Sequence, residues 1–204
     1  MTGKIKLNAT SGGGSVSFQA PSSTGDDRII TLPTTADGTV LTTTNPKAGN
    51  IIQVVQTEKS DVVSAQPDQT FTDISGFTAS ITPSSTTSKI LVTVMIFTVG
   101  VDVVQLRLLR DGSNILLGDT VTNKLSVAAG RYQTNNSTGS NYYGSEPMTL
   151  VKLDSPSTTS AITYKMQWRT SNSTNTLYLN RNLSDTSQYA FRTASTITLM
   201  EAAA

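Results

Sequence analysis

The sequence predicts an all-β protein with a short β-structured stalk at residues 1–46 and a jelly-roll β-sandwich head at residues 47–204. Apolar and polar residues alternate over many short stretches, and no stretch keeps a helical period for more than a turn or two. The chain is also rich in Thr, whose branched Cβ suits strands, and in Ser, which suits turns. The apolar segments are much shorter in the first fifty residues than later in the chain, which predicts two structural parts.

The stalk part contains short β-prone segments at residues 3–7, 12–18, 28–33 and 37–41. Each holds only two or three large apolar side chains and is cut off by Gly, Pro, Ser or Asp. One copy cannot form a core from so little, because ordering each residue costs roughly 1–2 kcal/mol of backbone entropy. We therefore expect several copies of the chain to share a stalk core. Its predicted members are Ile5, Leu7, Phe18, Ile30, Leu32, Val40 and Leu41.

The head part begins after a break in the pattern at residues 43–50. The strand predicted at residues 89–99 is apolar on both faces in its middle, which indicates a central strand or a subunit contact. Asp111-Gly112 predicts a hairpin turn. The predicted inward-facing residues come from the alternating segments: Ile81, Val92, Val94, Leu106, Leu108, Val151, Leu153, Tyr164, Met166, Trp168, Leu179, Ile197 and Leu199.

The composition excludes several kinds of chemistry. The chain has no Cys and no His, which removes disulfides, thiolate catalysis, the usual general base and the commonest metal ligand. Carboxylates remain as candidate catalytic groups, and no pattern brings any two of them together. We therefore expect no enzymatic activity, no catalytic residues, no metal and no cofactor. The carboxylates in or beside the predicted head loops are Asp111, Asp119, Glu146 and Asp154.

Charge and hydropathy limit the possible partners. The formal net charge is +1, so there is no basic excess to neutralise the phosphates of a nucleic acid. The longest apolar run, residues 90–99, is too short to cross a membrane as a helix. We therefore expect no nucleic-acid binding and no membrane insertion.

The best candidate for a binding site is the long polar stretch at residues 130–147. It combines Tyr, which offers rigid contact area, with Asn, Ser and Gly, which offer adaptable hydrogen bonds. Long loops are usually functional or disordered. Contact with a host-surface glycan is one interpretation, and a solvated or subunit-packing loop is the other. The predicted receptor-binding residues are Arg131, Tyr132, Asn135, Asn136, Tyr142 and Tyr143.

Residues 11–23, SGGGSVSFQAPSS, resemble a segment found in structural proteins of tailed phages, especially those that infect cyanobacteria and marine bacteria. Residues 28–33, RIITLP, residues 36–41, ADGTVL, and residues 195–201, STITLME, continue the resemblance. Such proteins are usually trimeric fibres with a β stalk on the virion and an outward-facing C-terminal head. The head also resembles the trimeric jelly rolls of the tumour-necrosis-factor and C1q type.

The resemblance implies a homotrimeric tail or baseplate fibre that is assembled in the host cytoplasm, located on the virion and active in host attachment. The N-terminal stalk would bind another virion protein, and the head would bind a host-surface glycan. The alternative is a trimeric capsid decoration protein, or head fibre, that stabilises the shell. A soluble C1q-like ligand of a cellular organism is a third, weaker interpretation.

Overall fold

The computed structural model describes residues 4–8, 11–13, 15–19, 46–133, 144–186 and 188–204. The chain divides into two compact units, Met1–Val40 and Leu41–Ala204, and each is described by itself. The boundary predicted from the sequence lies at residues 46 and 47.

The first unit contains an antiparallel pair, β1 (Lys4–Asn8) and β2 (Ser15–Gln19), in which Leu7 lies opposite Val16. Gly12 and Gly13 have φ of 80° and 70° in the connection, a conformation that glycine adopts without a Cβ clash. These two glycines therefore serve a tight turn.

Three of the predicted stalk-core residues lie in this hairpin. Ile5 lies opposite Phe18 in the ladder, and Leu7 is 55% exposed in the single chain. Ile30, Leu32, Val40 and Leu41 lie outside the described residues. The shared core of several copies stays a prediction.

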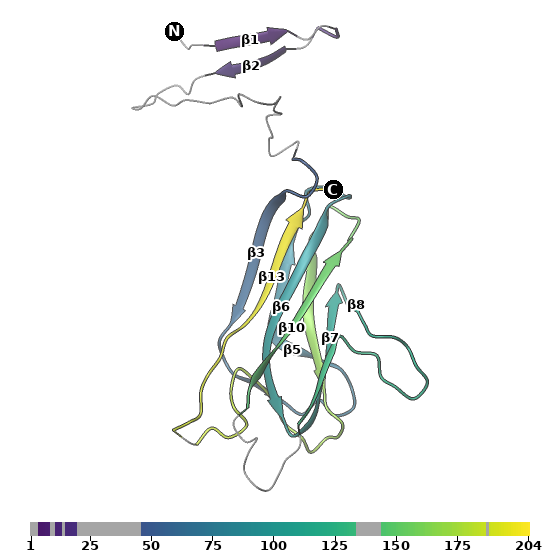
Figure 1. Ribbon diagram of the computed structural model, residues 1–204, viewed down its shortest axis with the longest axis vertical. Coiled ribbons are helices and arrows are strands. Elements are labelled where there is room, and N and C mark those ends of the chain that lie inside the picture. The colour runs from purple at the N-terminus through teal and green to yellow at the C-terminus, as the bar shows by residue number, and fades with distance from the viewer. Residues whose placement is uncertain (1–3, 9–10, 14, 20–45, 134–143, 187) are drawn as a thin grey trace, which may run out of the picture. The chain divides into compact units, whose positions relative to one another are not determined.

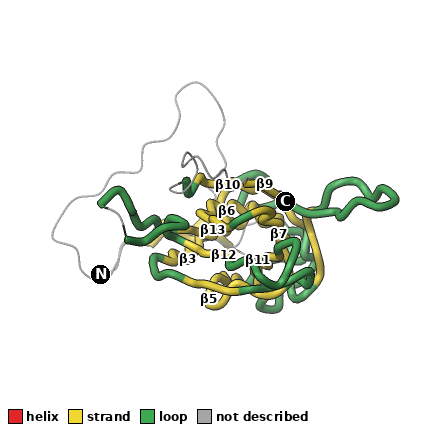
Figure 2. The backbone as a smooth tube through the Cα atoms, turned by 90° about the horizontal axis from the view of Figure 1, so that it is seen from below, coloured by secondary structure: helices red, strands yellow, loops and turns green. Residues whose placement is uncertain are grey.

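The second unit is a sandwich of two antiparallel sheets, which Figure 2 shows as two layers seen end-on. The first sheet contains β3 (Ile51–Lys59), β4 (Val63–Ala65), β6 (Lys89–Gly100), β10 (Glu146–Asp154), β12 (Leu177–Leu179) and β13 (Ser195–Ala202). The second sheet contains β5 (Thr72–Ile81), β7 (Asp102–Arg110), β8 (Ser113–Leu116), β9 (Ala129–Gln133) and β11 (Ile162–Arg169).

The strand order identifies a jelly-roll-like sandwich. The long strands of the first sheet run in the order β3-β13-β6-β10, and those of the second in the order β5-β11-β7 (Figure 1). The first and last strands, β3 and β13, lie side by side, and the chain passes back and forth between the sheets, as in a jelly roll. The described residues contain no helix. The predicted all-β class and jelly-roll head are confirmed.

One edge of the second sheet is made of two strands rather than one. Both β8 and β9 pair with β7, on the side away from β11, and residues 117–128 project from the sandwich between them (Figure 1). The predicted turn before β8 is confirmed, since Asp111 and Gly112 have φ of 47° and 86°. Positive φ at both positions is typical of a two-residue hairpin turn.

The core lies between the sheets, and most of the predicted inward residues are confirmed there. Trp168, the largest of them, is fully buried in β11, which supports its assignment to the core. The confirmed residues are Ile81, Val92, Val94, Leu106, Leu108, Tyr164, Met166, Trp168, Leu179, Ile197 and Leu199.

The prediction was wrong for Val151 and Leu153 of β10, which are 57% and 56% exposed. The buried carboxylate of Asp154 explains the difference. It accepts hydrogen bonds from Arg110 Nη1 at 2.5 Å and from the Tyr164 hydroxyl at 2.8 Å. Because successive side chains of a strand point to opposite faces, an inward Asp154 turns Val151 and Leu153 outward.

Candidate functional site

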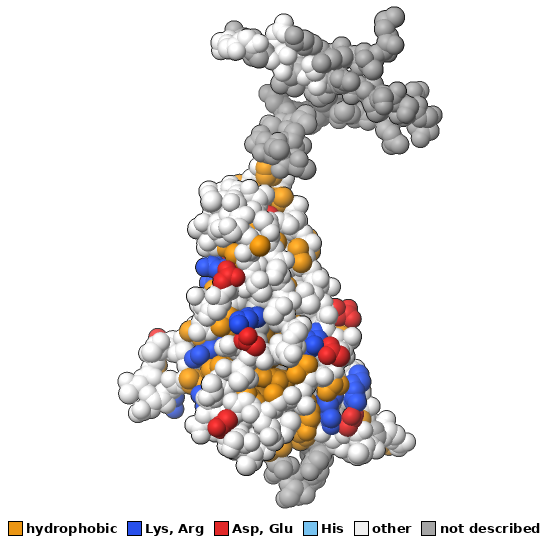
Figure 3. Space-filling view, turned by 180° about the vertical axis from the view of Figure 1, so that it is seen from behind, with side chains coloured by type: hydrophobic (Ala, Val, Ile, Leu, Met, Phe, Trp, Pro, Cys, Tyr) orange, Lys and Arg blue, Asp and Glu red, His pale blue; other side chains and the backbone are white. Residues whose placement is uncertain are grey.

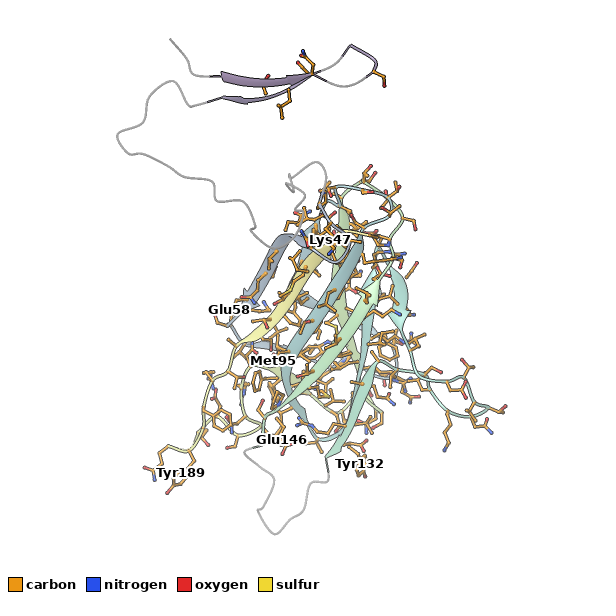
Figure 4. All side chains as sticks on the ribbon, turned by 45° about the horizontal axis from the view of Figure 1, so that its top comes forward. Lys47, Glu58, Met95, Tyr132, Glu146 and Tyr189 are labelled. Atoms are coloured by element: carbon orange, nitrogen blue, oxygen red, sulfur yellow. The ribbon has the colours of Figure 1, made fainter. Side chains whose placement is uncertain are left out.

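The two ends of the sandwich differ in what they carry. At one end the chain enters the sandwich beside its C-terminus, where Gly49 N donates to Ala203 O at 2.8 Å and Ala203 N donates to Asn50 O at 2.9 Å. We call this the proximal end. The opposite, distal end carries the end of β9, the start of β10 and the β12–β13 connection. Figure 4 shows Lys47 at the proximal end and Tyr132, Glu146 and Tyr189 at the distal end.

The stretch predicted as a loop, residues 130–147, is strand at both ends, because residues 130–133 belong to β9 and residues 146–147 to β10. Tyr132 lies near the end of β9, opposite Val103 of β7, and is 67% exposed. A tyrosine this exposed can offer its ring and its hydroxyl to a partner molecule. The predicted residues Asn135, Asn136, Tyr142 and Tyr143 lie outside the described residues. Of the six predicted contact residues, the structure therefore places Arg131 and Tyr132, and it places both at the distal end.

Arg131 is held by the protein itself. Its Nη2 donates to the carbonyl oxygen of Thr98, and its Nη1 lies 3.8 Å from Glu146 Oε2. Burial lowers the pKa of the Arg131 guanidinium, while the nearby Glu146 carboxylate opposes that effect. The side chain links β9 to the end of β6 and to the start of β10, so it supports the distal end.

The β12–β13 connection, residues 180–194, adds exposed aromatic groups that the sequence reasoning missed. Tyr189 is 70% exposed and Phe191 is 44% exposed. The signal that could have found them is aromatic residues inside a Ser-, Asn- and Asp-rich stretch, the same pattern that indicated residues 130–147. Three exposed aromatic side chains of the described residues, one near the end of β9 and two on the β12–β13 connection, thus lie at the same end.

Polar contacts hold this connection in place. Asn180, at φ 61°, donates from Nδ2 to Lys59 O at 2.7 Å and accepts from the Ser195 hydroxyl at 2.6 Å. Asp185 binds Arg192, with 2.7 Å between Asp185 Oδ2 and Arg192 Nη2, and the hydrogen bond from Arg192 lowers the pKa of Asp185. Tyr189 and Phe191 therefore lie on a connection that hydrogen bonds and an ion pair hold in place.

Three of the four candidate catalytic carboxylates, Asp111, Glu146 and Asp154, have structural partners. Asp154 binds Arg110 and Tyr164, and Asp111 accepts a hydrogen bond from Thr163 N at 2.9 Å. Within the described ranges, no group of three acidic, His or Cys side chains could hold a metal ion. The same ranges include no helix with the length and hydropathy to span a membrane. The expectations of no enzyme, no metal and no cofactor stay predictions.

A second surface of interest is the outer face of the first sheet, which faces the viewer in Figure 1. One row of paired positions crosses four strands from Val54 through Met200 and Leu91 to Leu153. The next row contains Thr198, Thr93 and Val151, and the third contains Met95. We call these three rows the apolar face. Its members are Val54, Met200, Leu91, Leu153, Gln56, Thr198, Thr93, Val151, Glu58, Thr196, Met95 and Thr149.

The apolar face is exposed and nearly uncharged. Val54, Val151 and Leu153 are each more than half exposed, and Glu58, near the edge on β3, is the only charged residue of the three rows (Figure 4). Contiguous exposed apolar surface on a folded domain usually marks an interaction site. The predicted central position of the strand at residues 89–99 is confirmed, because β6 lies between β13 and β10.

Comparisons with known proteins give fold-level likeness only. Neither the protein-family models nor the curated proteins include a match to this chain. A solved structure of infectious bursal disease virus, Gx strain, is similar over 96% of this chain and 46% of that chain, at 18% identity and a TM-score of 0.38. The VP2 subviral particle of the same virus is similar over 93% and 46%, at 15% identity and a TM-score of 0.35. The chain spans about half the length of these structures.

Proposed function

We propose that this chain is a homotrimeric phage virion fibre whose sandwich head contacts a host-surface glycan through its distal end. The observation that carries the proposal is the position of the exposed aromatic residues. Tyr132, Tyr189 and Phe191 lie at the end of the sandwich opposite to the point where the chain enters it. A head tethered at its proximal end leaves the distal loops free to meet a surface.

The apolar face supports the trimer. The row of Val54, Met200, Leu91 and Leu153 is exposed at both ends and half-buried in the middle, and no described residue outside the sheet covers it. Copies of the same chain are always available to one another during assembly. The hairpin of the first unit also supports an assembly of several copies, because Leu7 is 55% exposed in a single copy. Assembly would thus bury the exposed apolar side chains of both the stalk and the head.

A trimer would allow weak contacts with sugars to hold the virion on the host surface. Three copies present three identical sets of aromatic side chains, and simultaneous binding raises the apparent affinity without any new contact. Tyrosine suits this use because its large ring has only two side-chain torsions to order. The N-terminal part would attach to another virion protein, as the resemblance to tailed-phage structural proteins implies.

An antibody against the purified chain, bound to intact particles and located by electron microscopy, tests the proposal. We expect label at the tail or baseplate, and we expect Fab fragments that cover the distal end to block adsorption to host cells. Label on the head would favour the capsid decoration alternative instead. Particles without any label would contradict both.

A further inference from the structure

Two arginines converge on one aromatic ring on the outer side of the second sheet. The guanidinium carbon of Arg107 on β7 lies 3.9 Å from the centroid of the Phe71 ring, and that of Arg169 on β11 lies 5.8 Å from it. Arg169 pairs with Gln105, which is two residues from Arg107, so both arginines project from the same face of the sheet. We call Phe71, Arg107 and Arg169 the arginine cluster.

Neither arginine of the cluster has a carboxylate partner among the described residues. Asp73 lies in the same row as Arg107, with Gln167 between them, and each of its oxygens already accepts one hydrogen bond from another side chain. Its Oδ1 accepts from Gln167 Nε2 at 2.8 Å, and its Oδ2 accepts from Lys165 Nζ at 2.7 Å. Two positive charges therefore share one small area without a counterion among the described residues.

The Nε–H donors of the two arginines also lack good hydrogen bonds among the described residues. Among the described residues, Arg107 Nε is buried without a hydrogen-bond partner, and Arg169 Nε makes one long contact of 3.5 Å to Thr170 O. Stacking on Phe71 stabilises a cation through the electron-rich face of the ring, but it leaves the N–H groups unpaired. Like charges held side by side repel each other, and a shared anion removes that repulsion.

Guanidinium groups are well suited to bind oxyanions. The planar fork of an arginine donates two parallel hydrogen bonds to a carboxylate, phosphate or sulfate, and such charge-assisted bonds are among the strongest in proteins. Both half-buried arginines are partly ordered by the ring before any ligand binds. The cluster thus has the charge, the donors and the rigidity of an oxyanion site.

The position of the cluster connects it with the proposed function. Phe71 immediately precedes β5, and Arg169 ends β11, so both lie toward the distal end of the sandwich. Figure 3 views the molecule from behind Figure 1 and shows basic and acidic side chains scattered over this side, with hydrophobic side chains between them. A ligand that reaches the distal loops could also reach the arginine cluster.

We propose that Arg107 and Arg169 bind an oxyanion group of an acidic host-surface polysaccharide. This inference rests on the proposed attachment function and narrows its ligand from glycans in general to glycans that carry carboxylate, phosphate or sulfate. The hydrogen-bonding chemistry is the same for the three groups. A neutral glycan receptor would leave the arginine cluster without a ligand.

Binding of the purified full chain to defined polyanions tests the inference. Biolayer interferometry would use immobilised alginate, dextran sulfate and polyphosphate, with neutral dextran as the reference, at about 0.01 M and about 0.15 M salt. The test variant is Arg107→Gln/Arg169→Gln. The matched control is Lys47→Gln/Lys124→Gln, which removes the same charge at two exposed positions outside the cluster.

We expect the wild type to bind at least one polyanion and to ignore neutral dextran. The arginine double variant should bind roughly tenfold more weakly or worse, while the lysine control stays within about twofold. If circular dichroism shows that the double variant is unfolded, Arg169→Gln alone serves, because Arg169 lies farther from the ring, and it should still bind about threefold more weakly.

Two results would overturn the inference. The wild type could bind none of the polyanions, or both double variants could lose the same affinity, which would mean a general charge effect. Adsorption of phage that carry Arg107→Gln/Arg169→Gln separates this inference from the proposed function. Normal adsorption with lost polyanion binding would refute the arginine cluster as a receptor site and leave attachment through the distal loops standing.

Discussion

Met200 of β13 lies directly opposite Leu91 of β6, on the outer face of the first sheet. Val54 and Leu153 extend the pair on either side, so an apolar row crosses four strands where a solvated sheet normally shows polar residues. The row gives the proposed trimer a specific contact surface, and its residues can be changed one at a time.

Leu153→Asp should weaken assembly without unfolding the sandwich. Burial of one aliphatic side chain contributes about 1.5–3 kcal/mol, so its loss from a subunit contact weakens association by about tenfold or more. Sedimentation of the full chain over a concentration range measures the change. Val121→Asp is the control, because Val121 is similarly exposed, at 51%, on residues 117–128. If Leu153→Asp assembles like the wild type, the apolar face is not the subunit contact.

Asp154→Asn should destabilise the head. It removes the negative charge that Arg110 binds and weakens the bond to the buried Tyr164 hydroxyl, and breaking a buried ion pair costs about 3 kcal/mol. Urea unfolding monitored by tryptophan fluorescence measures the loss. Asp73→Asn is the comparison, because the Asp73–Lys165 pair is more exposed and should cost about 1 kcal/mol or less. Equal losses for the two variants would contradict a buried role for Asp154.

Glu201 should make the head sensitive to acid. Its side chain is buried, which alone would raise its pKa, but hydrogen bonds from Ser84 and Gln53 outweigh burial and lower the pKa below the ordinary 4.5. Ser84 N and Ser84 Oγ donate to Oε1 at 2.7 and 2.6 Å, and Gln53 Nε2 donates to Oε2 at 2.5 Å. A lowered folded-state pKa gives stability that is present above the unfolded-state pKa and is lost as the pH falls through the folded-state value.

We therefore expect Glu201→Gln to be less stable than the wild type near neutral pH, by about 1–3 kcal/mol, and to lose less stability on acidification to about pH 3. Thermal unfolding from neutral to acidic pH checks both effects. Asp119→Asn, at an exposed position within residues 117–128, should follow the wild type. Parallel pH curves for Glu201→Gln and the wild type would show that Glu201 does not carry the acid response.

Tyr132→Ala combined with Tyr189→Ala should reduce adsorption of phage to host cells without changing the melting temperature by more than a few degrees. Both side chains are at least two-thirds exposed, so their removal affects a bound partner more than the fold. Plaque and adsorption assays measure the effect. Lys47→Ala, at the proximal end, should adsorb normally. If the tyrosine variant adsorbs like the wild type, the distal aromatic residues are not the attachment site.

Sequence alone predicted the fold where one face of a strand is buried. Tyr164, Met166 and Trp168 alternate with polar residues, so their inward face could be read directly from the pattern. The same rule failed for Val151 and Leu153, because β10 has apolar residues on both faces. Its orientation depends on Asp154 reaching Arg110 and Tyr164, which are distant in sequence.

The site was partly predictable for a similar reason. Tyr132 stood out by the composition of residues 130–147, and it is exposed at the distal end. The convergence of Tyr189 with Tyr132 depends on the end of β9 and the β12–β13 connection meeting at one end of the sandwich, which only the strand order reveals. The arginine cluster likewise joins Arg107 of β7, Arg169 of β11 and Phe71, the residue before β5, and no local pattern marks it.

The mass of the intact chain in solution tests the central claim most directly. Size-exclusion chromatography with multi-angle light scattering should give three times the 21.6 kDa of one chain, and the value should hold on dilution to low micromolar concentration. A mass of one chain throughout the range would contradict the trimer, and with it the shared stalk core and the contact role of the apolar face.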